Sequence, residues 1–460
     1  MLFKLAFRNI LRNRRRSIMS AGAIAVGAIA MVLFGGFIAS IILGVQTDTV
    51  RRTGHLAIYR TGFFTFGSGN PAAWGMPGYR DILDLVRRDP VLAPLTAVVT
   101  PTVALFGIAG NFSIDASRTF VGSGVVPHDR DIMRRWNPYN LSYNNAAGSG
   151  LDDADPIKGV VGSGLARILG FCETLNLGNC PPPQPRETAQ TPIAADIAAL
   201  AASEKSETAA PDTLPHIDLL AATATGAPNV ISMVIGNVDR QGVKELDDAF
   251  VLMHFDLAQQ LLYGRGEKRA LAILLQLHAT SDLPAARARL TDIIRARNLD
   301  LEVRDFTEIV PLYSQIIAMF SAIFTFIAVI MAVIVLFTVG NTMSMSVMER
   351  TAEIGTARAI GLRRSGIRRQ FLLEAWILGA IGATTGIAAG IALALIVNQA
   401  GLIWLPPGQS APSPLAVIIG NMGQLPLAIW LGLIAATTLA AIIPANRAAR
   451  LPVVDALRHV

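Results

Sequence analysis

The chain has 460 residues, of which 52% are hydrophobic and only 16% are charged, and its mean hydropathy is +0.47. These values exclude an ordinary soluble protein of this size and predict a membrane protein. The formal net charge of +6 is distributed unevenly along the chain, so it indicates membrane topology and gives no support to nucleic-acid binding.

Residues 1–16 predict a basic amphipathic helix. The segment carries six basic side chains and no acidic one, and its apolar residues fall largely on one side of a helix. Two roles fit this pattern. The helix either lies in the interface of the inner leaflet, or it simply anchors the segment on the cytoplasmic side through its positive charge.

Four apolar segments are long enough to cross about 30 Å of hydrocarbon as helices of about 20 residues. The first, residues 17–45, has no charged side chain over its whole length. It exceeds the apolar core of a cleavable signal peptide, which is about 7–15 residues long, so we expect it to remain as an anchor. The other three predicted spans are residues 312–347, 375–398 and 425–443.

The distribution of Lys and Arg predicts the orientation of these spans. Residues 348–374 contain six Arg and three Glu, and the tail from 444 to 460 contains three Arg and one Asp. Basic residues favour the cytoplasmic side. We therefore expect a multi-pass protein of a bacterial inner membrane with both termini and residues 348–374 in the cytoplasm. Residues 46–311 and the loop 399–424 would lie outside.

Residues 46–311 predict a large extracytoplasmic α+β domain, inserted between the first and second spans. Apolar, β-branched runs indicate strands, and amphipathic runs indicate helices. The expected strands are 54–59, 93–110, 272–279 and 301–306, and the expected helices are 79–88 and 284–297.

The middle of this domain differs in composition. Residues 181–215 are rich in Pro, Ala, Ser and Thr, so we expect a mobile insertion over about 172–229, with a short helix near 194–205. Cys172 and Cys180 are the only cysteines of the chain. On the oxidising side of a membrane they are expected to form a disulfide, and two unpaired thiols are the alternative.

Several kinds of catalytic and metal-binding pattern are absent from the sequence. There is no G-x-x-x-x-G-K-[ST] phosphate loop, no H-E-x-x-H, no G-x-S-x-G and no metal-spaced set of Cys and His. The predicted spans contain no ionisable side chain, which argues against an ion-driven transporter. We therefore predict no catalytic residue, no metal site and no cofactor bound by this chain, so energy would have to come from another chain.

The charged segment "MERTAEIGTARAIGLRRSG" (348–366) interrupts this apolar region. On a continuous helix it would have one face of small residues that lets another backbone approach, and a neighbouring face that offers carboxylates to a partner. Gly361 is suited to end that helix, and Ser365 to begin the next. The small face comprises Met348, Ala352, Gly355 and Ala359, and the other face comprises Glu349, Glu353 and Thr356.

This segment and the helix after it resemble the FtsX-like permease superfamily, the MacB and LolC/LolE type of ABC-transporter membrane subunits. That family has roughly E-R-x-x-E-I-G-x-x-R-A-x-G, followed by a hydrophobic helix that starts with an acidic residue and contains spaced glycines. The matching residues are Glu349, Arg350, Glu353, Ile354, Gly355, Arg358, Ala359, Gly361, Glu374, Gly379, Gly382, Gly386 and Gly390.

Other segments extend the resemblance. "LAFRNILRNRRRS" is similar to the opening of the family, "LPPG" (405–408) to its external loop, and "IIPANRAARLPVVDALR" (442–458) to its close. Within the predicted outer domain, "GHLAIY", "VVGSGLARILG" (160–170) and residues 234–262 look most like the lipoprotein-releasing LolC/LolE branch. Residues 172–229 depart from that branch, so the identity of the substrate does not carry over.

The resemblance implies a MacB-like periplasmic core and a mechanism. Residues 348–374 would contain the coupling helix, which docks on a separate ABC ATPase dimer that holds ATP and Mg. The matching residues from Glu349 to Gly361 would transmit force. Further implied partners are a second permease copy or a related permease, a periplasmic carrier or outer-membrane component, and membrane lipid.

Two functions follow from this resemblance. The first is extraction or export of a lipoprotein, a lipid or another amphiphile by mechanotransmission at the outer face of the inner membrane. The second is an FtsX-like signalling subunit that regulates an extracytoplasmic enzyme without transport. For residues 348–374 the simpler alternative is a cytoplasmic hairpin whose charges only stop translocation.

Overall fold

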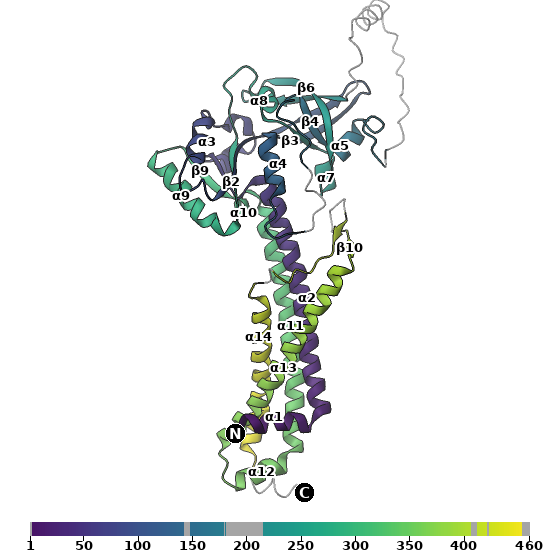
Figure 1. Cartoon of the computed structure of the whole chain (residues 1–460), viewed down its shortest axis with the longest axis vertical. Helices are drawn as coiled ribbons and strands as arrows, with labels where there is room; N and C mark the ends of the chain where they lie inside the picture. Colours follow the sequence, from purple (N-terminus) through teal and green to yellow (C-terminus); the bar gives the residue numbers. More distant parts are fainter. Residues whose placement is uncertain are drawn as a thin grey trace, which may run out of the picture. The chain divides into compact units, whose positions relative to one another are not determined.

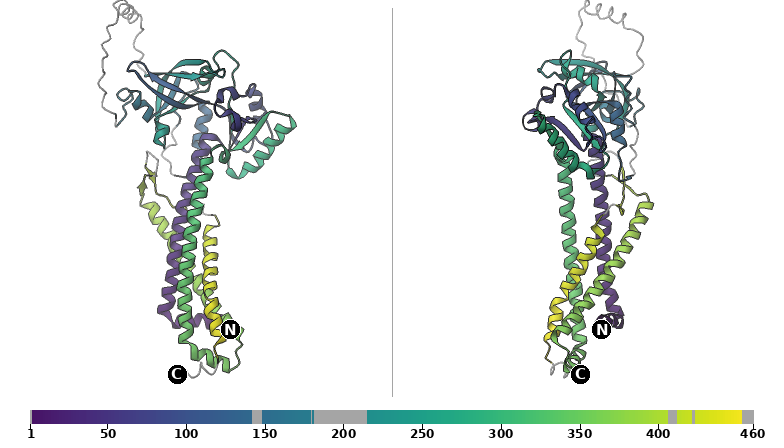
Figure 2. Two further views of the ribbon diagram at one scale, coloured as in Figure 1. Left: turned by 180° about the vertical axis from the view of Figure 1, so that it is seen from behind. Right: turned by 60° about the vertical axis from the view of Figure 1, so that its left-hand side comes forward.

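The structure is a computed structural model that describes residues 2–141, 148–178, 180, 215–405, 412–420 and 423–452 (Figure 1). The chain divides into two compact units. The helical unit consists of Met1–Gln46, Leu312–Trp404 and Ser413–Val460, and the sheet unit consists of Thr47–Pro311 and Leu405–Pro412. Figure 2 shows the elements of each unit from two further directions.

Within the described residues, four helical segments are long and apolar enough to cross a membrane. A helix rises about 1.5 Å per residue, so even the shortest of them, with 26 residues, covers the hydrocarbon core. They are α2 (Arg14–Thr53), α11 (Pro311–Glu349), α13 (Arg364–Gln399) and the consecutive pair α14 (Leu425–Ala440) and α15 (Ile442–Arg450). The same unit contains α1 (Leu2–Arg12), α12 (Thr351–Ala359) and a two-stranded ribbon of β10 (Ile403–Trp404) and β11 (Ser413–Pro414).

Glycine residues on α13 allow close packing against α2 and α14. A Cβ atom at Gly386 would lie 2.5 Å from the carbonyl oxygen of Ala25, and one at Gly382 would lie 2.9 Å from the carbonyl oxygen of Ala21. Gly379 faces α14, where a Cβ atom would collide with the hydroxyl of Thr437. Small residues at this spacing let helices approach within a membrane, where lipid tails remove any hydrophobic drive for association.

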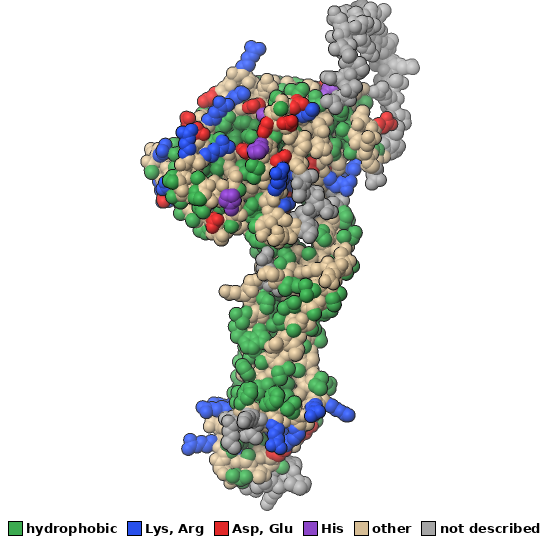
Figure 3. Space-filling view, in the orientation of Figure 1, with side chains coloured by type: hydrophobic (Ala, Val, Ile, Leu, Met, Phe, Trp, Pro, Cys, Tyr) green, Lys and Arg blue, Asp and Glu red, His purple; other side chains and the backbone are tan. Residues whose placement is uncertain are grey.

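The surface of the helical unit is apolar over most of its length, and Lys and Arg side chains gather at one end (Figure 3). Large apolar side chains of α11, among them Phe326, Val333 and Phe337, are exposed. A surface of this kind suits hydrocarbon better than water, as the sequence predicts for a membrane-spanning region.

The sheet unit is built on a nine-stranded sheet with the order β3-β7-β4-β6-β5-β2-β8-β1-β9. Because β3 also pairs with β2, the first six strands in that order form a closed ring, and β8, β1 and β9 extend from it. The strands are β1 (Leu56–Arg60), β2 (Thr96–Asn111), β3 (Ala116–Val125), β4 (Lys158–Gly162), β5 (His216–Ala222), β6 (Pro228–Asp239), β7 (Phe250–His254), β8 (Ala272–Leu277) and β9 (Leu301–Asp305).

The length of β2 makes this topology possible. On one edge, Thr96–Thr102 pairs with β8 and Gly107–Gly110 pairs with β5, while the other edge pairs with β3 from Thr102 to Asn111. One 16-residue strand therefore belongs both to the ring and to its extension.

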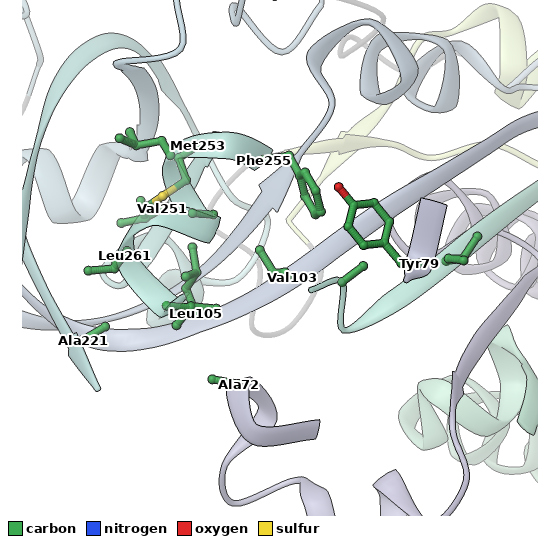
Figure 4. Close-up of a cluster of buried hydrophobic side chains, with 14 of the residues drawn as sticks. Ala72, Tyr79, Val103, Leu105, Ala221, Val251, Met253, Phe255 and Leu261 are labelled. Carbon is green, nitrogen blue, oxygen red and sulfur yellow. The ribbon is translucent and has the colours of Figure 1, made fainter. Parts of the chain in front are cut away.

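The core of the sheet unit lies between the strands and the helices that cover them. Figure 4 shows Val103 and Leu105 of β2, Val251 and Met253 of β7, and Leu261 of α8 in one buried cluster. From Thr102 to Ala109, buried and less buried residues of β2 largely alternate, which is the pattern of a half-buried strand. The helices are α3 (Tyr79–Arg87), α4 (Pro127–Arg135), α5 (Ser163–Ile168), α7 (Lys244–Asp247), α8 (Phe255–Tyr263), α9 (Leu283–Ala296) and α10 (Phe306–Ile309).

The expected strands at 54–59, 93–110, 272–279 and 301–306 correspond to β1, β2, β8 and β9, and the two expected helices correspond to α3 and α9. The expectation of a mobile insertion over 172–229 is wrong for its last part. Residues of β5 pair with β2 and β6, and Ile217 and Leu219 are fully buried. Their alternation with polar or half-buried neighbours is the strand signal that the composition of the region obscures. Residues 181–214, with the short helix expected at 194–205, lie outside the described residues.

Candidate functional site

Arg350, near the start of the charged segment, forms a buried ion pair with Glu374. Arg350 separates α11 from α12, and Glu374 lies in α13. Nη1 of Arg350 is 3.1 Å from each carboxylate oxygen of Glu374, and the two residues are only 7% and 3% exposed. A buried pair of this kind is costly to break, because the remaining charge would lack a partner away from water.

Further polar groups complete the surroundings of this pair. Nδ2 of Asn9 on α1 donates to Glu374 at 2.7 Å, and Gln370 donates to the same carboxylate at 3.4 Å. The guanidinium of Arg350 also lies over the ring of Phe371, 5.5 Å from its centroid. One carboxylate therefore joins α1, the α11–α12 junction and α13. A cavity of about 30 Å³ adjoins it, between α1, α2, α11 and α13.

The outward carboxylates of the segment also have partners within the chain. Glu353 is 2.5 Å from a guanidinium nitrogen of Arg12, and Glu349 is held by two nitrogens of Arg16, at 2.5 and 2.7 Å. Arg12 is the last residue of α1 and Arg16 lies in the first turn of α2, and α1 lies at the same end of the helical unit as α12 (Figure 1). In this structure both glutamates bind the N-terminal segment, and their docking on a partner stays a prediction.

The expected face of small residues is also different from the prediction. The helix is interrupted at Arg350, so Met348 and Glu349 end α11 rather than begin α12. Ile354 and Gly355 are buried, and Ile354 belongs to the apolar cluster that contains Ala445 and Ala448 of α15. Of the four residues expected on the small face, Gly355 is buried and Ala352 is half-buried, whereas Met348 and Ala359 are exposed.

The end of α12 follows the sequence prediction, whereas the start of α13 does not. Gly361 has φ +106°, its N–H donates to the carbonyl of Arg358, and the N–H of Leu362 donates to the carbonyl of Ala357. This is the Schellman arrangement, which favours glycine at its left-handed position. Arg358 in turn donates to the carbonyl of Leu451, after α15. Ser365 does not cap α13, because that helix already begins at Arg364.

Two groups of residues at this site were missed by the sequence analysis. One comprises Asn9, Arg12 and Arg16, whose contacts lie more than 300 positions away in the sequence. The other comprises the apolar side chains beside Gly361: Ile360 is 83% exposed, and Leu362 is also exposed. Apolar residues next to a helix-ending glycine in a charged segment are the signal that would have found them.

The sheet unit contains the two cysteines and a buried carboxylate. Cys172 and Cys180 form a disulfide with a Cα–Cα distance of 6.0 Å. Asp247 accepts hydrogen bonds from the N–H groups of Ser163 and Gly164, at 3.0 and 2.8 Å, and from the Ser163 hydroxyl at 2.6 Å, so it fixes the start of α5. Among the residues that the structure describes, no group of three or more His, Cys, Asp or Glu side chains could hold a metal ion.

Comparison with known proteins places the part of this site that lies on α11, α12 and α13 within a recognised domain. Residues 325–453 match the family model described as FtsX-like permease C-terminal. The match begins within α11 and covers α12 to α15. It therefore contains Arg350, Glu374 and the exposed Ile360.

Curated relatives agree with this match. The chain is 29% identical over 238 residues to the macrolide export ATP-binding/permease protein MacB of Marinobacter nauticus, a match that covers 50% of this chain and 34% of that protein. It is 30% identical over 198 residues to MacB of Rhodopirellula baltica, with 41% and 26% covered. The matches span about a third or less of these relatives' length. These matches support the FtsX-like ABC permease superfamily for this chain, through residues 325–453 above all.

Proposed function

We propose that this chain is the membrane subunit of an ABC transporter that works by mechanotransmission, coupling ATP hydrolysis on a separate cytoplasmic ATPase dimer to work on an amphiphile. The relatives are named ATP-binding/permease proteins, whereas this sequence has no phosphate loop of the Walker type. ATP and Mg would therefore be bound by the ATPase.

The observation that carries this proposal is the attachment of α12 to the rest of the helical unit. Arg350 and Glu374 join its start to α13, and Arg358 joins its end to the residue that follows α15. Such links would pass a displacement of α12 on to two spans. The exposed Ile360 and Leu362, at the end of α12, are the surface that we assign to the ATPase.

A continuous helix would carry the movement further. Glycines of α13 pack on α2, and α2 is one helix of 40 residues whose last part, from Thr47, belongs to the sheet unit. Within that unit, Nη1 of Arg130 on α4 donates to the carbonyl of Arg51 at 2.6 Å and to that of Arg52 at 3.4 Å. The end of α2 is thereby held to α4, so that α2 would transmit force into the sheet unit.

The distribution of charge indicates on which side of the membrane each unit lies. The positive end of the helical unit contains α1 and α12, so we assign it to the cytoplasm and the sheet unit to the periplasmic side of an inner membrane. Only 11% of the residues in the most apolar stretch of α11 are buried within the chain. We therefore expect a second permease copy or a related permease to cover this helix. A periplasmic carrier or an outer-membrane component would receive the cargo.

The cargo that we propose is a lipoprotein, a lipid or another amphiphile. The relatives' names specify macrolide export, and the lipoprotein-releasing branch rests on the sequence resemblance alone. The FtsX-like signalling function, in which the same movement regulates an extracytoplasmic enzyme, is the alternative that a transport assay decides.

The test is Ile360→Asp in the full chain, reconstituted in nanodiscs with the ABC ATPase encoded nearest to it. Ile360 is exposed, so the variant should insert and fold normally while stimulation of ATP hydrolysis falls at least tenfold. Val243→Asp is the matched control, because Val243 is an exposed apolar residue of the sheet unit. Full stimulation by Ile360→Asp would refute the docking surface, and stimulation without release of any acylated protein or lipid would favour signalling.

A further inference from the structure

The short helix α1 presents two different faces. On one, Ala6 is fully buried, Asn9 binds Glu374, and Ile10 packs against the apolar cluster of the helical unit. On the other, the large apolar side chains Phe3, Phe7 and Leu11 are exposed. Their spacing of four residues places them in one stripe along the helix. The helix is therefore fixed on one side and shows an apolar surface on the other.

Basic side chains accompany this stripe. Arg8, Arg12 and Arg15 are exposed, and residues 1–16 include no acidic residue. An apolar stripe bordered by guanidinium groups matches the headgroup region of a membrane that contains anionic lipid. The four apolar spans already place this unit in a membrane, so α1 needs no other partner to cover its exposed face.

Two arginines of this segment form ion pairs with glutamates of the chain, and lipid phosphates could compete for them. Arg12 pairs with Glu353 of α12, and the side chains are 54% and 51% exposed; Arg16 pairs with Glu349, and these side chains are 30% and 45% exposed. Exposed ion pairs contribute little to stability, because water screens them and long side chains lose freedom. The phosphates of an anionic leaflet attract the same guanidinium groups and remain at high local concentration.

We propose that anionic phospholipid headgroups compete with Glu353 for Arg12 and with Glu349 for Arg16, so that the lipid composition of the membrane controls the attachment of α12 to α1 and of the end of α11 to the start of α2. The part-buried contact of Asn9 with Glu374 and the burial of Ala6 keep α1 in place while the outer pairs exchange. Loss of these ion pairs would let α12 move more freely, and that this affects coupling rests on the function proposed above. The lipid competition itself does not require the ATPase.

The test measures the distance between α1 and α12 in the full chain without any ATPase. Spin labels are placed at Leu11→Cys, where the label preserves an apolar side chain, and at the exposed Thr356→Cys. Cys172 and Cys180 are disulfide-bonded and take no label. We expect the fraction of molecules with a long distance between the two labels to be at least about three times larger in nanodiscs that contain phosphatidylglycerol than in nanodiscs of phosphatidylcholine alone.

Two variants define the controls. Arg12→Gln with Arg16→Gln should show the same distances in both lipids, because neither pair remains. Arg14→Gln removes the same kind of charge, but Arg14 donates to the carbonyl of Leu11 and not to α12, so its lipid response should match that of the parent chain. Unchanged distances in the labelled parent, or an equal shift produced by inorganic phosphate in neutral nanodiscs, would overturn the proposal.

Discussion

Arg350 and Glu374 are 24 positions apart, yet the guanidinium of Arg350 contacts both carboxylate oxygens of Glu374 in the interior of the helical unit. Few ion pairs in the described chain are so well protected from water, and this one connects three elements through Asn9. Its position makes it both a structural link and the step through which movement of α12 would reach α13.

The first prediction concerns this pair. Glu374→Leu removes the buried partner of Arg350 and leaves it only the 3.3 Å contact with the half-exposed Glu353, so it should lower the free energy of unfolding by up to about 3–5 kcal/mol. Glu353→Leu removes a half-exposed carboxylate that contacts Arg12 and Arg350 while the bond from Arg350 to Glu374 remains, and should cost less, about 1 kcal/mol. Unfolding of the full chain in detergent, followed by helical circular dichroism, measures both. Equal losses would show that burial does not set the strength of the pair.

The second prediction concerns the glycines of α13. Gly386→Leu would place side-chain atoms where Ala25 and Ala28 of α2 already lie, and should destabilise the helical unit by about 1–3 kcal/mol. Gly22 of α2 has no heavy atom within 4 Å of its Cβ position, so Gly22→Leu provides the matched control. The midpoint of thermal unfolding in detergent compares the two. A larger loss with Gly22→Leu would contradict the packing.

The third prediction is a pH dependence in the sheet unit. Burial lowers the pKa of His55 from 6.5 to about 4. Its Nδ1 accepts a hydrogen bond from the N–H of Leu277 at 2.9 Å, and its ring meets Trp136 edge-on, with centroids 4.9 Å apart. The neutral ring therefore suits the folded state, whereas the unfolded chain takes up a proton near pH 6.5.

The sign of the effect follows from the lowered pKa. The stabilising contribution of neutral His55 is complete above about pH 6.5 and is lost as the pH falls toward 4, by about 3 kcal/mol in total. Unfolding of the full chain monitored by Trp fluorescence at pH 7.5 and 4.5 measures it. His55→Asn should be less stable at pH 7.5 and lose less on acidification, while His278→Gln, at an exposed position, should behave like the parent.

The fourth prediction concerns the disulfide. Under non-reducing conditions, intact mass spectrometry should find the peptide that contains Cys172 linked to the one that contains Cys180. The bond closes a short loop, with a sequence separation of 8, so Cys172→Ser with Cys180→Ser should destabilise the sheet unit by at most about 2–3 kcal/mol. Free thiols in protein isolated from an oxidising compartment would refute the pairing.

Local pattern in the sequence was sufficient for the spans and for several strands. A long apolar run without charge predicts a membrane helix whatever the tertiary contacts are, because its transfer into hydrocarbon depends on the residues of that run alone. The end of α12 at Gly361 is similarly local, since its left-handed conformation is set by two neighbouring hydrogen bonds. The resemblance to FtsX-like permeases also depends on the order and spacing of nearby residues, and the family match agrees with it.

The sequence thus determined the membrane character of the chain, its resemblance to FtsX-like permeases and the position of the charged segment. Only the tertiary structure decided that Glu349 and Glu353 bind Arg16 and Arg12, that Gly355 is buried, and that β5 belongs to a closed ring of strands. Hydropathy adds up along a segment, whereas an ion pair or a strand pairing depends on which distant residues the fold brings within a few ångströms. That information is absent from the local pattern.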